Sequence, residues 1–525
     1  MNRAPAQASA IARKAAQSHD WATVKACAGE ILRRDATSAE GHFLAGLVEK
    51  AAQRPAAAAE CFAHALALDA SRYDAAIELA SRYSVMDRHS EAFELLQRYE
   101  PSLANSPRYL DVAGLAYSTI GLHARAWPLY RRANDLQPDV PRFMANLAAC
   151  AVNLGRVEEA QALYRSLLER NPTHQRNHYE LSRLGPAQDA SHVEQMKSVL
   201  RSTNLPADRN IFLYYAIGKE LEDLGRWQEA FEYYRKAGDA VTSVSNYDVA
   251  DDVRLIETVI RVCDTAWLGS GADAAPAAAG GAGAPIFVAG LPRTGSTLIE
   301  RIVASHSRVE SIGETMQFQK ALRRVSGVAT ADSMNADIIV AAAERDTRLV
   351  AAGYLDAIRY RLTGKPLFIE KFPDNFLYLG FIAKAWPDAR FVYPRRHPMD
   401  ACFAMYKQSF FRYAYALEDV GRYYVAHDRL LRHWRSLLGD RLVEVQYESL
   451  VADQEGETRT LLARLGLEFE PACLEFEKNT AASATASAVQ VREKIHARSI
   501  GRWRRFSTEL EPLRALLERS GIEAG

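Results

Sequence analysis

Small and large apolar residues recur at a fixed interval through the first third of the chain. The positions of Gly114, Ala126 and Tyr130 return about 34 residues earlier and later, again as small residues or as large apolar ones. Small residues suit the points where two helices touch, and large ones fill the space between helices. About five such copies cover residues 5–172, and they predict paired helices stacked into an α-solenoid.

The interval is lost over residues 173–208, where prolines interrupt helical segments, and returns from Gly218 onward. We therefore expect residues 173–268 to contain irregular helices, one further repeat and a helix that caps the stack. Residues 269–284 consist almost entirely of Gly, Ala, Pro and Ser, which predicts a flexible linker and a domain boundary.

After the linker, the pattern changes to short apolar runs that alternate with helical stretches. The runs predict buried parallel strands at residues 286–291, 367–370, 390–393 and 442–446. The stretches between them predict helices at residues 297–305, 334–362, 377–386, 398–413, 418–438 and 455–465. This alternation predicts a doubly wound α/β domain that binds ligands at the carboxyl ends of its strands.

The composition bears on the cellular location and the partners of the protein more than on its function. Of the 525 residues, 48% are hydrophobic and 25% are charged, and the formal net charge is zero, so no general attraction to nucleic acid is expected. We find neither an apolar run of about 18 residues nor a secretory leader, so no membrane span is expected. The six cysteines form no CxxC pair and no metal-site spacing, which favours a reducing cytoplasm.

A loop of small residues follows the first predicted strand, in the segment Pro292-Arg293-Thr294-Gly295-Ser296-Thr297. A strand, a tight loop and a helix N-terminus together point backbone N–H groups at a phosphate-like anion. The spacing from Gly290 to Thr297 is that of a phosphate-binding loop, except that Ser296 stands where an NTPase has lysine. The nearest cation is Arg293, which opposes a kinase or NTPase.

Two family resemblances follow from these motifs. The repeats resemble the tetratricopeptide repeat. The segments PRTGST, YPRRHPMDACFAMYKQSF, YESL and SIGRWRRF resemble PAPS-dependent sulfotransferases, most closely protein-tyrosine sulfotransferases and bacterial enzymes linked to tetratricopeptide repeats. The second resemblance covers residues 285–510 and implies a P-loop-like sulfotransferase domain that uses PAPS as its sulfuryl donor.

The resemblance also implies roles for individual residues. The first loop would hold the phosphosulfate through Arg293, Thr294, Gly295, Ser296 and Thr297. The remaining donor contacts would come from Arg396 at the 3′-phosphate, Tyr447 beside the adenine, and the late loop with Ser499, Gly501, Arg502 and Trp503. Glu314 matches the general base of the tyrosine-sulfating group, and Lys371 matches a lysine near the transferring sulfuryl.

The chemistry requires a proton acceptor but no metal. Sulfuryl transfer is an in-line displacement that positioned donors and cations can stabilise, with Arg293 and Lys371 as the catalytic cations. A hydroxyl acceptor must lose its proton, so a carboxylate or an imidazole is needed within hydrogen-bond reach. Glu314 and His306 are the two candidates, and we favour Glu314.

One departure from the family leaves two functions open. Ala404 stands where the family has a serine that also binds the 3′-phosphate, with Ser409 as a substitute one helical turn further on. The chain is therefore either a sulfotransferase acting on a hydroxyl acceptor, such as a protein tyrosine, or an interaction protein whose nucleotide-binding domain is inactive. The solenoid offers either a groove for a protein or peptide, or a scaffold surface that includes a homodimer interface.

Overall fold

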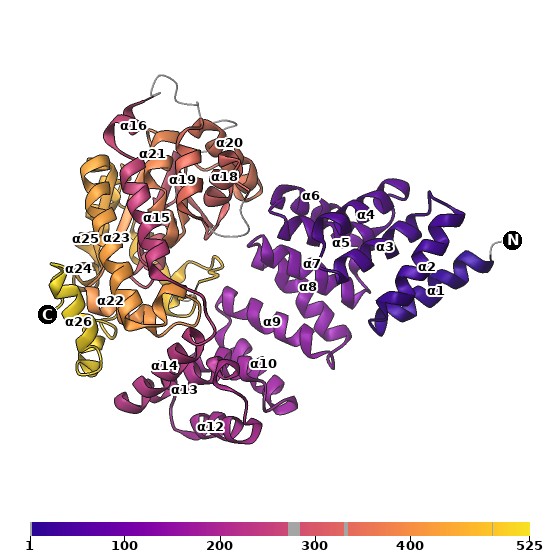
Figure 1. Cartoon of the computed structure of the whole chain (residues 1–525), viewed down its shortest axis with the longest axis horizontal. Coiled ribbons are helices and arrows are strands. Elements are labelled where there is room, and N and C mark those ends of the chain that lie inside the picture. The colour runs from indigo at the N-terminus through magenta and orange to yellow at the C-terminus, as the bar shows by residue number, and fades with distance from the viewer. Residues whose placement is uncertain (1–2, 271–283, 330–333, 486) are drawn as a thin grey trace. The chain divides into compact units, whose positions relative to one another are not determined.

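The computed structural model of the protein describes residues 3–270, 284–329, 334–485 and 487–525. Most of the linker expected at 269–284 lies outside these residues. The chain forms two compact units (Figure 1). The first unit consists of Met1–Leu154 and Ala357–Tyr360, and the second consists of Gly155–Asp356 and Arg361–Gly525.

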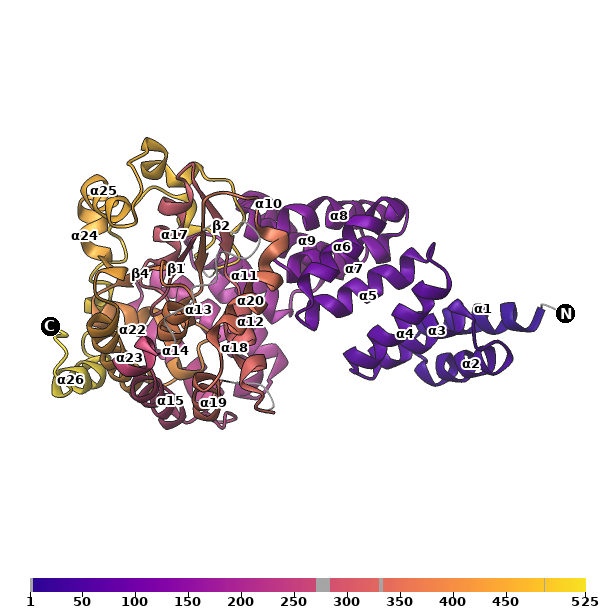
Figure 2. The same cartoon turned by 90° about the horizontal axis from the view of Figure 1, so that it is seen from above.

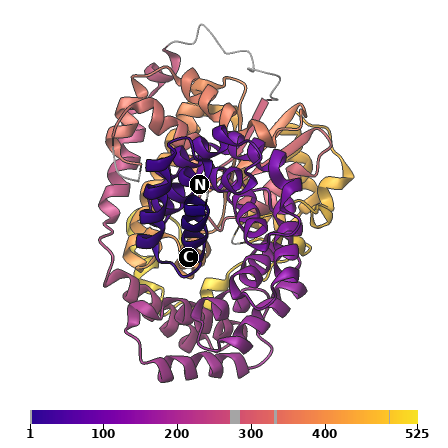
Figure 3. The same ribbon diagram turned by 90° about the vertical axis from the view of Figure 1, so that its right-hand side faces the viewer.

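The first unit is a helical array. Successive helices lie side by side, as the view with the N-terminus towards the reader shows (Figure 3). Its helices are α1 (Arg3–Gln17), α2 (Trp21–Arg34), α3 (Ala39–Ala51), α4 (Pro55–Leu68), α5 (Tyr73–Val85), α6 (His89–Tyr99), η1 (Glu100–Leu103), α7 (Pro107–Thr119), α8 (His123–Leu136) and α9 (Pro141–Leu154).

A glycine facing an aromatic ring closes several of these helix pairs. A Cβ added to Gly46 would lie 2.5 Å from a ring carbon of Phe62, and one added to Gly114 would lie 2.8 Å from Tyr130. Both rings are buried. Neither glycine could therefore be replaced without moving the partner helix, and the small and large positions of the repeat are confirmed as helix contacts.

The second unit begins with more helices of the same kind. These are α10 (Val157–Arg170), α11 (Gln175–Ser182), α12 (Ser191–Thr203), η2 (Ala207–Arg209), α13 (Ile211–Asp223), α14 (Trp227–Thr242), α15 (Val249–Val262) and α16 (Thr265–Gly269). The pair α13–α14 repeats the glycine contact, because a Cβ on Gly218 would lie 2.8 Å from Tyr234. Helix α15 packs along α19 (Ala336–Ala343) and α23 (Leu417–Leu438).

A five-stranded parallel sheet forms the centre of the second unit (Figure 2). Its strands are β1 (Ala284–Val288), β2 (Val309–Gly313), β3 (Leu367–Lys371), β4 (Arg390–Arg395) and β5 (Leu442–Gln446). Their order is β2-β3-β1-β4-β5, so the chain turns to one side of β1 for β2 and β3 and to the other for β4 and β5. Ligands of such sheets bind where the direction reverses, at the carboxyl ends of β1 and β4.

Both faces of the sheet are buried, as expected for a parallel sheet. Ile286 and Val288 of β1 point into an aliphatic core with Ile299 and Ile302. Phe287 points to the other face, where it lies in a cluster of rings with Phe318, Tyr354, Trp386 and Phe391. The first strand is therefore held from both sides, and the loop that follows it has a rigid base.

The remaining helices cover the sheet and its edges. They are α17 (Ser296–Ala304), α18 (Gln317–Ser326), α19, α20 (Thr347–Ile358), α21 (Leu379–Ala385), α22 (Pro398–Tyr406), α23, α24 (Tyr447–Ala452), α25 (Gln454–Arg464) and α26 (Glu511–Arg519). Short 3₁₀ turns lie between them at η3 (Arg359–Arg361), η4 (Pro373–Leu377), η5 (Arg412–Ala414), η6 (Gly439–Arg441), η7 (Pro471–Leu474), η8 (Phe476–Lys478), η9 (Gln490–Arg492) and η10 (Arg502–Phe506).

The four predicted strands are confirmed, but three details of the predicted elements are wrong. The helix expected at 398–413 ends at Tyr406, because the chain turns after α22 and continues as η5. Strand β2 was not predicted, because VESIG has only two apolar residues, Val309 and Ile312, in five positions. The single helix expected at 334–362 is broken into α19 and α20. Asp346 accepts a hydrogen bond from the N–H of Arg348 (2.9 Å), which turns the chain between them.

None of the helices in the described residues combines the length and the low polarity that crossing a lipid bilayer requires. Within the same ranges, no group of three or more His, Cys, Asp and Glu side chains is placed to hold a metal ion.

Candidate active site

The loop between β1 and α17 has an unusual backbone. Arg293 and Gly295 both have positive φ, of 65° and 99°. Gly295 also lies under a tyrosine, since an added Cβ would be 2.7 Å from Cδ2 of Tyr447. The Thr294 hydroxyl donates to the carbonyl oxygen of Leu291 (2.6 Å) and closes the loop. The loop therefore enters α17 directly, with Ser296 and Thr297 buried in the helix's first turn, which is the geometry of an anion cradle.

Arg396, just after β4, joins this loop to the late loop. Its Nη1 donates to the carbonyl oxygen of Arg293 (2.9 Å), and its Nη2 donates to that of Ser499 (2.5 Å). The guanidinium lies over the ring of Tyr447, 5.1 Å from the centroid. The hydroxyls of Tyr447 and Ser499 are hydrogen-bonded to each other at 3.0 Å. Four residues from four separate segments of the sequence thus meet at the carboxyl ends of β1 and β4.

This cluster carries more positive than negative charge. The side chain of Arg293 donates to the neutral Ser487 and Gln490 (Nη2 to Oε1, 3.1 Å). Burial, and then the charge of Arg396, lowers the pKa of Arg293 to about 10. Across the described ranges, neither arginine forms an ion pair with a carboxylate, and the Nε of each is buried without a hydrogen-bond partner. Two uncompensated cations beside an anion cradle are a strong electrostatic signature of an anion site.

The late loop is fastened to the start of α22. The buried carboxylate of Asp400 accepts hydrogen bonds from the N–H of Gly501 (2.6 Å) and of Trp503 (3.2 Å). The indole of Trp503 stacks on His397, with ring centroids 5.7 Å apart. The side chain of Arg502 reaches the last repeat, because its Nε donates to Glu222 at the end of α13 (2.9 Å). Gly501 and Trp503 therefore shape the loop, and the side chain of Arg502 is tied to the last repeat.

Lys371 and Glu314 form a second, smaller cluster. Lys371 is the last residue of β3 and is 1% exposed, and its Nζ donates to Oε1 of Glu314, which follows β2. In the sheet, Lys371 pairs with Val288, the last residue of β1. The N–H of Gly290 donates to the carbonyl oxygen of Pro373 (3.1 Å). The pair thus lies beside the strand end from which the anion-cradle loop begins.

His306, the alternative base, is in a different environment. Its Nδ1 accepts from the N–H of Arg308 (3.1 Å), and its Nε2 donates to the carbonyl oxygen of Glu468 (3.0 Å). The ring is 2% exposed. Both ring nitrogens are hydrogen-bonded to the main chain, and Nε2 also lies 3.4 Å from Oε1 of Glu470, so His306 holds the turn after α17.

The two residues at the departure from the family pattern are also resolved. Ala404 lies within α22. The hydroxyl of Ser409 is hydrogen-bonded to that of Tyr179 in α11 (2.9 Å), so the residue expected to substitute for the missing serine already has a partner.

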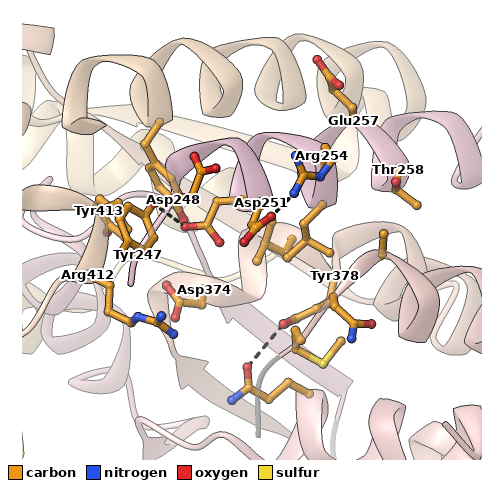
Figure 4. A pocket seen from close by; sticks show the side chains of 18 of the residues that line it. Tyr247, Asp248, Asp251, Arg254, Glu257, Thr258, Asp374, Tyr378, Arg412 and Tyr413 are labelled. Atoms are coloured by element: carbon orange, nitrogen blue, oxygen red, sulfur yellow. Dashed lines mark hydrogen bonds and ion pairs between the residues drawn. The ribbon is translucent and has the colours of Figure 1, made fainter. Parts of the chain in front are cut away.

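A cavity of about 1070 Å³ is lined by Met316, two residues after Glu314, and by Asp374, whose pKa the charge of Glu314 helps to raise (Figure 4). Its walls hold an aromatic set made of Tyr247, Tyr378, Phe410, Phe411, Tyr413 and Tyr423, and an acidic set made of Asp248, Asp251, Asp252, Glu257, Asp337 and Asp374. Burial, and then the charges of Glu314 and Asp252, raises the pKa of Asp374 to about 6. Arg254 and Arg412, both exposed, also line the cavity.

Several residues of this region were not predicted. Asp400, Ser487 and Gln490 make contacts that depend on chain segments far apart in sequence, and the cavity is built from four such segments. Glu222 did carry a signal. It lies four residues after Gly218, where the repeats of Gly114 and Gly46 have Ser118 and Lys50.

Comparison with known proteins agrees with these features. Residues 285–471 match the sulfotransferase family, and residues 121–183 and 213–237 match tetratricopeptide repeats. The chain is 26% identical over 389 residues to an uncharacterized protein of Aquifex aeolicus, covering 71% of this chain and 50% of that protein. It is 25% identical over 226 residues to a Caenorhabditis briggsae protein named "Putative protein-tyrosine sulfotransferase", covering 42% of this chain and 80% of that protein.

Solved structures give more distant matches. The sulfotransferase domain of the Synechococcus PCC 7002 olefin synthase is 19% identical, with a TM-score of 0.31, and the match covers 42% of this chain and 88% of that one. A tetratricopeptide-repeat protein of Thermus thermophilus is 16% identical, with a TM-score of 0.29, and the match covers 34% of this chain and 98% of that one. The chain spans half the length of the Aquifex relative.

Proposed function

Because the chain combines a sulfotransferase-family domain with tetratricopeptide repeats, we propose that it transfers a sulfuryl group from PAPS to an acceptor hydroxyl. The transfer forms a sulfate ester and releases PAP and a proton. The observation that carries the proposal is the pair Arg293 and Arg396, which lies at the anion-cradle loop without a carboxylate counter-ion among the described residues.

The donor site is built from the residues around that pair. PAPS, when bound, supplies a sulfuryl group activated by its bond to phosphate. The unpartnered Nε atoms of Arg293 and Arg396 are suited to its anionic groups, and the glycine at 295 lets the loop approach closely. Thr294, Ser296 and Thr297 offer hydroxyls and N–H groups at the start of α17. Tyr447 and the loop with Ser499, Gly501, Arg502 and Trp503 complete the site.

Lys371 and Glu314 provide the groups for the chemical step. The carboxylate of Glu314 takes the proton of the acceptor hydroxyl as the new S–O bond forms. The ammonium group of Lys371 now bonds to Glu314, and it is placed to balance negative charge that develops on oxygen. Its almost complete burial strengthens that electrostatic effect, because little water screens it.

The cavity lined by Met316 and Asp374 is our candidate for the acceptor site. Aromatic rings and carboxylates can pack against and hydrogen-bond a hydroxyl compound. The name of the Caenorhabditis relative favours a protein tyrosine as acceptor, and the repeats favour a protein or peptide partner. The six free cysteines support a cytoplasmic reaction.

The alternative is a domain that binds the nucleotide without turnover. The observation in its favour is Ala404, which removes one hydroxyl from the expected phosphate contacts, while Ser409 is already bonded to Tyr179. A lost hydrogen bond to a charged group would weaken binding by about 1.5–3 kcal/mol. This is too little to abolish function in a site with two arginines.

Donor binding can be tested by thermal melting with PAP and, separately, with ATP. A ligand that binds only the folded state raises the melting temperature, so PAP should stabilise the protein far more than ATP does. If PAP causes no shift at millimolar concentration, the proposed donor is wrong.

Turnover separates the enzyme from the inactive alternative. PAP release from PAPS in the presence of candidate acceptors should fall about 10²–10⁴-fold in Glu314→Gln, while the melting shift with PAP is kept. Glu344→Gln, at an exposed residue after α19, is the matched control and should behave as wild type. Unchanged turnover in Glu314→Gln would exclude Glu314 as the base, and absence of turnover in the wild type with every acceptor would favour the alternative.

A further inference from the structure

The end of α13 places a buried carboxylate between two cations of the sulfotransferase domain. Glu222 is 5% exposed. It accepts hydrogen bonds from Nζ of Lys407 at 2.8 and 3.0 Å, from Nε of Arg502 at 2.9 Å and from the hydroxyl of Tyr234 at 2.8 Å. Although burial opposes ionisation, the charge of Lys407 and the other contacts lower the pKa of Glu222.

The repeat itself does not need this acid. Four residues after the glycine that contacts the aromatic ring, the repeats of Gly114 and Gly46 have Ser118 and Lys50, and both form the same helix pair. A buried carboxylate is costly unless it is paired and hydrogen-bonded, and here both cations come from outside the repeat. The carboxylate therefore serves the contact of α13–α14 with the α/β domain, and the helix pair can close without it.

Both cations belong to the segments that build the donor site. Lys407 directly follows α22, the helix that carries Asp400, and Arg502 lies between Gly501 and Trp503, whose N–H groups Asp400 binds. Glu222 therefore binds both segments at once: it contacts the end of α22 through Lys407 and the late loop through Arg502.

The guanidinium of Arg502 is hydrogen-bonded through its Nε and not through its two Nη atoms within the described residues. Its Nε is bonded to Glu222, and its plane lies near the indole of Trp227 in α14, 5.0 Å from the ring centroid. Within the described residues, neither Nη of Arg502 has a hydrogen-bond partner. An arginine held in this way presents two donors to an anion with little loss of side-chain freedom on binding.

We infer that Glu222 is a positioning residue of the proposed donor site: it orients Arg502 towards a phosphate of the donor and so makes the last repeat, α13–α14, part of that site. The inference rests on the proposed function. It assigns the pair α13–α14 to the donor-binding machinery, and by linkage a partner bound to this repeat would change donor affinity, and the donor would change partner affinity, by the same factor.

A double-mutant cycle on the full chain tests this inference. The variants are Glu222→Gln, Arg502→Gln and the two together, and the measurement is the dissociation constant of PAP by calorimetry. Glu222→Gln should weaken PAP binding about tenfold, with the acceptor KM unchanged. In the Arg502→Gln background it should have no further effect. Glu91→Gln, on α6 of the first unit and paired with Arg88, is the matched control and should leave PAP affinity unchanged.

A second variant covers the case in which Glu222→Gln destabilises the fold by leaving Lys407 unpaired. Glu222→Gln combined with Lys407→Met removes both charges, and it should melt close to wild type while still binding PAP weakly. Recovery of PAP affinity in this variant, additive effects in the cycle, or a Glu222→Gln protein that binds PAP normally would each overturn the inference. If the wild type itself does not bind PAP, the proposed function fails and the inference fails with it.

Discussion

Two helix pairs of this protein follow the same repeat pattern but have different surroundings. In α7–α8 of the first unit and in α13–α14 of the second, a glycine faces a buried tyrosine, and an added Cβ would lie 2.8 Å from the ring in both. Helices α7 and α8 pack against α5, η1 and α9 of their own array. The pair α13–α14 instead packs its rings against α22 and η10 of the α/β domain.

The residues that make this difference lie outside the repeat signature. Phe231 stacks on Tyr406 with centroids 5.9 Å apart, and Trp227 meets Phe506 at 5.8 Å. Glu222 adds the ion pairs with Lys407 and Arg502. The periodic positions therefore determine how a helix pair closes on itself, and the other positions determine what the pair joins. A repeat array recognised from its period alone need not be a separate domain.

Truncation should expose this difference most strongly. A chain that begins at residue 155 retains α13–α14, and it should run without aggregates in size-exclusion chromatography and keep its melting shift with PAP. A chain that begins at residue 245 loses the pair, exposes Phe403, Tyr406 and Phe506, and leaves Lys407 without its counter-ion. It should aggregate. If the shorter chain is monomeric and binds PAP as well as the longer one, the last repeat is not part of the second unit.

Sequence periodicity predicted the elements that carry strong patterns and missed those that do not. Strands β1, β3 and β4 lie inside the sheet and are nearly continuous apolar runs because both of their faces are buried. Strands β2 and β5 lie at the two edges of the sheet and are buried to the same pattern, but LVEVQ contains three aliphatic residues and VESIG only two, so β5 was predicted and β2 was not. An edge strand is therefore visible in the sequence only where most of its residues are apolar.

The residues of the candidate site likewise fall into those that the sequence predicted and those that it did not. Arg293, Lys371 and Arg396 lie at the ends of predicted strands, and the rule that parallel strands present their carboxyl ends at one edge predicts that they lie near one another. Glu314 was identified by the family resemblance, because β2 was not predicted. Contacts such as Arg293 with Ser487 join segments nearly two hundred residues apart, with no periodic signal to mark them. Pairings of this kind depend on the tertiary fold and cannot be derived from local sequence.

A matched pair of core substitutions tests whether the two units unfold separately. Phe506 and Phe62 are both completely buried, one against α14 and α22 of the second unit and the other in the first array. Replacing either with alanine should cost about 3–5 kcal/mol. In calorimetry, Phe506→Ala should lower only the transition of the second unit and weaken PAP binding, and Phe62→Ala should lower only that of the first unit. A single transition that both substitutions lower equally would show that the units unfold together.

The free energy of unfolding of the second unit should depend on pH through a buried carboxyl group in its sheet. This effect should be smaller than those of the substitutions above. Glu370 in β3 is fully buried and accepts hydrogen bonds from Tyr354 (2.9 Å), from Asn375 (3.2 Å) and from Thr315. Burial raises its pKa from 4.5 to about 7 in spite of these bonds. The folded state therefore binds a proton more tightly than the unfolded state does. The stability that this group contributes is complete below pH 4.5 and is lost as the pH rises through 7.

Glu370→Gln isolates that contribution, because glutamine is neutral at every pH. Between about pH 5 and pH 8, the free energy of unfolding of the variant should rise relative to wild type by up to about 3 kcal/mol. The comparison must be between the two proteins, since His427, whose pKa burial lowers to about 3, acts in the opposite direction in both. The measurement is chemical denaturation of the full chain at each pH, in which the transition of the second unit is followed. A constant difference across this range would mean that Glu370 is ionised in the folded protein, and a change in the transition of the first unit would contradict the separation of the two units.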